Sequence, residues 1–168
     1  MALNIYQASI PSFVQTLNAL SGVLNKAAAH AEAKKIDPSV LINARLAPDM
    51  HPLARQIQMV SDQAKGAAAR LAGVDIPSFP DTEATFAELQ QRIAKTVEFV
   101  KSLKPAQFEG ADDREVSMTI AGQKISWNGA TYLFNFVYPN FYFHASTAYD
   151  ILRHNGVEIG KRDFLGSF

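Results

Sequence analysis

The stretch from Leu133 to Gly156 constrains the fold of this chain more than any other segment. Residues three and four positions apart fall on one face of a helix with 3.6 residues per turn. Along this stretch that face reads Leu133, Val137, Asn140, His144, Ala148, Ile151 and Asn155. It is apolar on both sides of Asn140 and His144, which lie one turn apart. Because an unpaired buried polar group costs about 1–3 kcal/mol, both side chains must find hydrogen-bond partners inside the fold.

Three earlier segments show the same helical spacing. The first covers about residues 10–35, with Ser9 as its expected cap. The second covers about residues 52–71 and stops at Gly73, and the third covers about residues 86–103 after a capping-box sequence. With the last stretch, these segments predict an all-α, up-down four-helix bundle that forms one domain over residues 1–168.

The region between the third and fourth helices differs in pattern. Apolar and polar residues alternate over 115–120, a turn signal follows at Ala121 and Gly122, and a second extended run ends at Trp127. This predicts a short hairpin or an ordered loop packed by Trp127. In the last helix, Pro139 predicts a kink, because proline has no backbone N–H to donate.

The composition excludes several classes of function. The chain of 168 residues has no cysteine, so thiol nucleophiles, zinc–thiolate sites and iron–sulfur clusters are excluded. Its 16 basic and 16 acidic side chains balance, which argues against nucleic acid or an anionic membrane as partner. The N-terminus lacks the pattern of a signal peptide, and no apolar run is long enough to span a membrane. We therefore expect a cytoplasmic protein.

Several pieces of the sequence resemble the DinB-like (YfiT-like) four-helix bundles. The end of the last helix, ILRHNGVEIGKRDFLG, is similar to the closing segment of those proteins. The pieces ARLAPDMHPLARQ, RLAG and PNFYFHASTAYDILRHNG are similar to one branch of that superfamily, a domain family of unknown function. The resemblance covers essentially the whole chain.

The resemblance also implies where a metal would lie. DinB-like proteins often hold a divalent ion with one histidine from the second helix and two from the fourth. In this chain those positions fall on Gln56, Asn140 and His144, so one imidazole and two amides remain. Amide oxygens bind zinc or nickel weakly, so we expect no cofactor. If a divalent metal such as Zn or Ni binds, His144 and His51 are its expected ligands.

Two interpretations of the polar residues on this face remain open. Asn140 and His144 are either a satisfied polar pair in the core or part of a ligand pocket, for which Gln56 and Tyr149 are the further candidates. His51 is either a capping residue or points away from the core stripe. The excess of aromatic residues around the last helix predicts a homodimer.

Two functions follow from these interpretations. The first is a dimeric protein that binds an unidentified small molecule at a degenerate metal site. The second, implied by the resemblance, is a divalent-metal-dependent enzyme of hydrolase or thiol-transferase type that uses His144.

Overall fold

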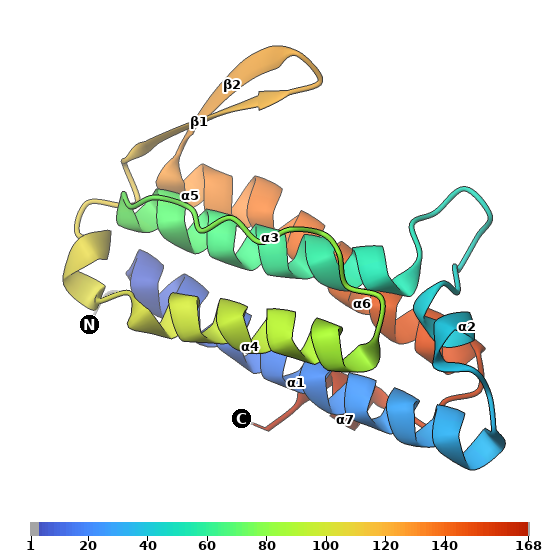
Figure 1. Ribbon diagram of the computed structural model, residues 1–168. Helices are drawn as coiled ribbons and strands as arrows, with labels where there is room; N and C mark the ends of the chain where they lie inside the picture. The colour runs from blue at the N-terminus through green and yellow to red at the C-terminus, as the bar shows by residue number, and fades with distance from the viewer. Residues whose placement is uncertain (1–3, 168) are drawn as a thin grey trace.

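Four long helices supply most of the core in the computed structural model, which describes residues 4–167 (Figure 1). They are α1 (Ile5–Lys34), α3 (Leu53–Ala72), α4 (Phe86–Ser102) and α6 (Tyr138–His154). The shorter elements are α2 (Pro38–Ile42), the 3₁₀ turn η1 (Pro105–Phe108), α5 (Gly129–Thr131), the π-helical segment η2 (Tyr132–Val137) and α7 (Lys161–Leu165). None of the helices described is both long and apolar enough to cross a membrane.

The ends of the long helices follow from local hydrogen bonds. α4 begins with the expected capping box of Thr85 and Glu88, and Gly73 ends α3 with a positive φ of 71°. α1 begins five residues earlier than expected. Its cap is Asn4, whose side chain accepts the backbone N–H of Gln7 at 2.8 Å, and not Ser9. Ser9 is buried within the helix and donates to a carbonyl one turn back.

The expected up-down order is wrong at one step, because α3 and α4 run in the same direction (Figure 1). The start of α4 lies beside the start of α3: Arg55 and Gln58 of α3 bond Asp81 and Glu83, which come just before α4. Further along, the Ser61 hydroxyl of α3 hydrogen-bonds that of Thr96 of α4 at 2.7 Å. The connection over residues 73–85 therefore returns along α3 before α4 begins. The other neighbours of α3 and α4 run antiparallel to them. For the last helix this is shown by two bonds to α3, Gln56–His144 from α6 and Arg70–Tyr132 from η2.

The last helix is continuous from Gly129 to His154 but changes its hydrogen-bond pattern midway. The segment η2 is π-helical, with Tyr138 N–H bonded to Leu133, and Pro139 lies in the first turn of α6. The side-chain amide of Asn140 donates to the Phe136 carbonyl at 2.6 Å. A π-helical segment before the proline accommodates its missing donor, and the kink predicted at Pro139 stays a prediction.

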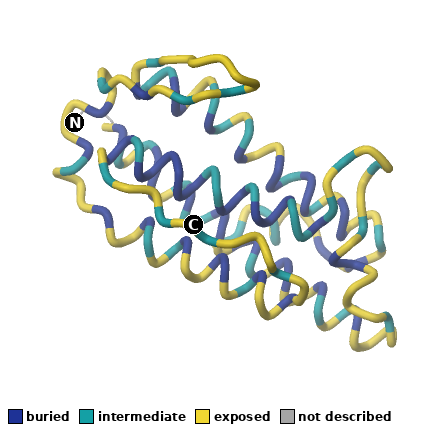
Figure 2. Tube along the Cα trace, turned by 45° about the horizontal axis from the view of Figure 1, so that its top comes forward, coloured by how far each residue is buried: buried dark blue, intermediate teal, exposed yellow. Residues whose placement is uncertain are grey.

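Two small elements complete the fold. Strands β1 (Glu115–Ile120) and β2 (Gln123–Asn128) form an antiparallel hairpin that is mostly exposed (Figure 2), with Val116 opposite Trp127 at its base. The Trp127 ring lies 5.1 Å from that of Phe136. At the other end of the chain, α7 packs on α1, where Asp163 pairs with Lys26 at 2.7 Å.

A buried arginine holds the connection between α3 and α4 in place. Arg92 of α4 is only 2% exposed. Its guanidinium bonds Asp62 of α3 at 2.8 Å, Asp81 at 2.9 Å and Glu83 at 3.0 Å, and it also donates to the Pro80 carbonyl at 3.2 Å. One side chain thus ties the connection to both helices. Its Nε, however, has no acceptor, the one such enclosed side-chain nitrogen or oxygen among residues 4–167.

We predict that Arg92→Met destabilises the protein by about 3–5 kcal/mol, because it leaves three carboxylates together without their shared cation. Urea denaturation monitored by circular dichroism measures the loss. Lys95→Met, which removes an exposed cation one turn further along α4, is the matched control and should change stability by less than about 0.5 kcal/mol. Equal stability of the two variants would contradict the structural role of Arg92.

Gly129 marks a close approach between two backbone segments where the last helix begins. A Cβ at this position would overlap the carbonyl oxygen of Ala111 and lie 3.1 Å from Leu71 Cδ2. We predict that Gly129→Ala lowers the free energy of unfolding by about 1–3 kcal/mol through this overlap. Gly22 is exposed in α1 with open space around it, so Gly22→Ala should instead stabilise the protein by about 1 kcal/mol. Thermal unfolding of both variants tests the prediction, which fails if Gly129→Ala is neutral.

Candidate functional site

The imidazole of His144 faces α3 from the middle of α6. Its Nδ1 lies 2.8 Å from Oε1 of Gln56, which is 1% exposed. The amide nitrogen of Gln56 in turn donates to the backbone carbonyl of His51 at 3.0 Å, just before α3 begins. The pair predicted from the sequence, Gln56 and His144, is therefore joined by a direct hydrogen bond between two antiparallel helices.

The surroundings keep the His144 ring neutral near pH 7. Burial lowers the pKa of His144 below its ordinary value of 6.5, and the nearby charges of His51 and Arg55 lower it further. A neutral imidazole has one N–H and one lone pair, so it can donate with one nitrogen and accept with the other. This is the state in which histidine acts as a base, a ligand to metal or a hydrogen-bond acceptor.

Within residues 4–167, the side chains of the other candidate residues make no hydrogen bond to this pair. Asn140 is one turn before His144, but its amide is used by the Phe136 carbonyl and makes no hydrogen bond to Gln56 within the described residues. Tyr149 lies on another flank of α6, where its ring packs edge-on against Phe164 of α7. His51 contributes its backbone carbonyl, and its side chain is exposed.

The donor set does not fit a transition-metal centre of the three-histidine kind. Gln56 and His144 use Oε1 and Nδ1 to bond each other, and the Asn140 side chain donates with its amide nitrogen. Residues 4–167 contain no group of three or more histidine, aspartate or glutamate side chains placed to hold an ion. A single imidazole with amide neighbours is a weak site for zinc or nickel.

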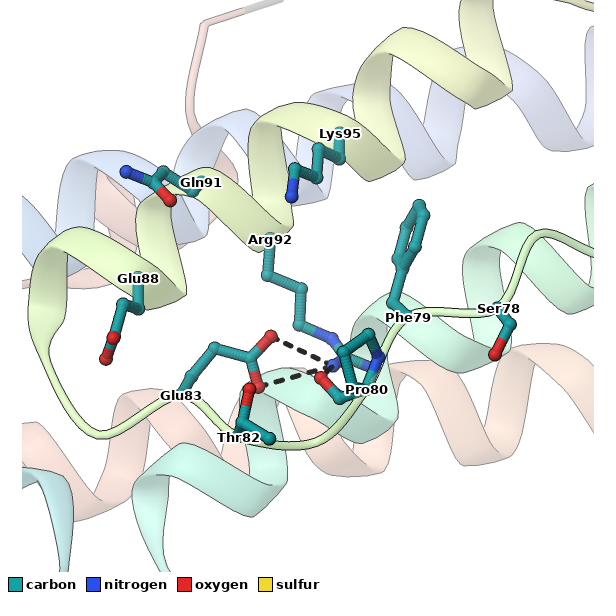
Figure 3. A pocket seen from close by; sticks show the side chains of 9 residues that line it. All are labelled: Ser78, Phe79, Pro80, Thr82, Glu83, Glu88, Gln91, Arg92 and Lys95. Carbon is teal, nitrogen blue, oxygen red and sulfur yellow. Dashed lines mark hydrogen bonds and ion pairs between the residues drawn. The ribbon is translucent and has the colours of Figure 1, made fainter.

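A second polar site was not predicted from the sequence. Next to Arg92, a cavity of about 550 Å³ lies between the connection and α4 (Figure 3). Its walls include Phe79 and Pro80 from the connection, and Gln91 and Lys95 from α4. Arg92 lies three residues after the buried Leu89 and directly before the buried Ile93, so it falls at the edge of the apolar face of α4. A cation at that position was the feature of the sequence from which a buried arginine could have been predicted. Its partners were unpredictable because Asp62, Asp81 and Glu83 meet only in the folded chain.

Comparisons with known proteins agree with this architecture. The family described as "Domain of unknown function (DUF1993)" matches residues 5–165. A crystal structure of a DinB family member protein from Shewanella denitrificans is 41% identical and superimposes with a TM-score of 0.91, over 98% of this chain and 93% of that one. A search of curated proteins finds no match. The chain therefore belongs to the DinB-like domain family of unknown function DUF1993.

Proposed function

We propose that this protein is a cytoplasmic homodimer that binds a small molecule at His144, at the place where the resemblance puts the metal of DinB-like proteins. The observation that supports this most is the bond between His144 Nδ1 and Gln56 Oε1 at 2.8 Å. It fixes the ring in a mostly buried position and leaves Nε2 without a partner inside the described chain. Ligand sites contain a few precisely placed polar groups that fix the orientation of the ligand, and a held imidazole with an unpartnered nitrogen can act as one of them.

The alternative is a divalent-metal-dependent enzyme of hydrolase or thiol-transferase type that uses His144. The unpartnered nitrogen of the imidazole is the feature that favours it, because a neutral ring nitrogen is a good metal ligand. Against it stands the donor set: the neighbour of His144 on the same helix face is Asn140, and the nearby imidazole of His51 would give only two histidines, which with amides make a weak site. A metal assay separates the two functions.

We predict that the purified protein, after extensive dialysis, holds far less than one transition metal ion per chain, because one imidazole with amides binds such ions weakly. Elemental analysis measures the content, and titration with Zn²⁺ and Ni²⁺ followed by thermal unfolding should show little stabilisation. His144→Ala and the exposed His30→Ala are compared as test and control. One bound metal per chain that is lost only in His144→Ala would overturn the proposal and favour the enzyme.

The dimer is proposed to form through exposed aromatic residues on the last helix. Phe134 is 49% exposed and Tyr142 is 37% exposed, and both rings contact Tyr138 between them. The three rings follow each other at four-residue spacing and so form one strip along the helix. Aromatic residues are enriched in the buried centres of protein–protein interfaces, which supports this strip as the centre of the proposed interface.

We predict that the double variant Phe134→Ser, Tyr142→Ser is monomeric at micromolar concentration, whereas the unaltered protein is a dimer. Light scattering coupled to size-exclusion chromatography measures the mass, for which one chain is 18.4 kDa. Val40→Ser, at a residue of α2 that is 57% exposed, is the matched control and should remain dimeric. An unaltered protein that runs as a single chain would show the dimer proposal to be wrong.

A further inference from the structure

The orientation of the Gln56 amide is set by its partner on the other side. The amide nitrogen donates to the His51 backbone carbonyl at 3.0 Å, and a carbonyl can only accept. The NH₂ group must therefore face His51, and the amide oxygen must face His144, where it lies 2.8 Å from Nδ1. Because an amide oxygen also only accepts, the proton of this bond belongs to Nδ1 of the imidazole.

The second ring nitrogen of His144 is consequently a lone-pair acceptor. In a neutral imidazole only one nitrogen is protonated, so a proton on Nδ1 leaves Nε2 without one. Nε2 makes no hydrogen bond within residues 4–167. Among these residues, Arg92 Nε is the one side-chain nitrogen or oxygen that is both enclosed and without a partner, so Nε2 of His144 is not enclosed. Nε2 therefore reaches the surface of the protein, where a ligand can contact it.

An aromatic side chain lies beside the imidazole ring that carries this acceptor. The ring of Phe143 packs edge-on against the imidazole of His144 with centroids 5.2 Å apart, and Phe143 is 55% exposed. An accessible acceptor next to an accessible aromatic ring suits a compound with a ring and a hydroxyl group. A carboxylate suits it poorly, because an ionised carboxylate offers only acceptors to the Nε2 lone pair.

We infer that Gln56 is a positioning residue that holds His144 as the Nδ1–H tautomer, so that Nε2 accepts a hydrogen bond from a neutral, hydroxyl-bearing aromatic ligand. This inference rests on the proposed function, because it names the ligand class of the same site. The tautomer of His144 is a property of the protein without ligand, so this part of the inference can be tested without any ligand.

The tautomer is measured by ¹⁵N NMR of the histidine rings at pH 8, where an ordinary histidine is neutral. The unaltered protein should show protonated Nδ1 and unprotonated Nε2 for His144. Gln56→Met, which has a similar shape but no acceptor, should lose this preference, whereas Gln56→Glu should keep it because a carboxylate still accepts from Nδ1. Gln63→Met on the same helix is the matched control. A protonated Nε2 in the unaltered protein, or an unchanged tautomer in a folded Gln56→Met variant, would overturn the inference.

The ligand class is tested with phenol and anisole, which share a ring but differ in the hydroxyl donor. Phenol should shift the Nε2 resonance of His144 in a saturable way, and anisole should not. In Gln56→Met the phenol affinity should fall about ten-fold, while Gln63→Met keeps it. Equal shifts with the two compounds, or no saturable shift with phenol, would overturn the ligand class. A failure of the proposed function would instead be seen as bound metal in the elemental analysis.

Discussion

The fold depends on the ion cluster around Arg92, because that cluster makes two parallel neighbouring helices possible. Consecutive helices joined by a short loop run antiparallel, and a parallel pair requires a connection that returns along the full length of one helix. Residues 73–85 are such a connection, and none of these residues is buried. Asp81 and Glu83 instead meet Arg92, and Asp62 joins them from α3. The ion pairs of the buried arginine thus hold this segment against the bundle, whereas apolar packing holds the helices.

Both polar sites of the protein use the first half of α3. Gln56 turns toward α6 and bonds His144, whereas Gln58 turns the other way and donates to Glu83 at 2.9 Å. Arg55 connects the two regions, since it pairs with Asp81 and its charge also acts on His144.

The candidate site differs in chemistry from the three-histidine arrangement that the resemblance implies. Replacing two imidazoles by amides removes the donors that transition metals prefer, but it creates a hydrogen-bonded pair whose geometry is fully defined. Gln56 can accept from His144 only because its own amide nitrogen has a fixed partner in the His51 carbonyl. In the proposed function, these helix positions orient a ligand by a lone pair in place of a metal ion.

The sequence alone determined the helices, because helix formation depends on spacing and capping within a few residues. The capping box at Thr85 and Glu88, the stop at Gly73 and the periodic face that carries His144 could all be predicted. The partnership of Gln56 and His144 followed from the resemblance. Only the tertiary structure decided that α3 and α4 are parallel, that Tyr149 packs against Phe164 of α7, and that Arg92 gathers carboxylates from α3 and from the connection over residues 73–85. These features depend on contacts between residues far apart in the chain. The periodicity of one helix shows which of its faces is apolar, but it does not show which distant side chains that helix will contact.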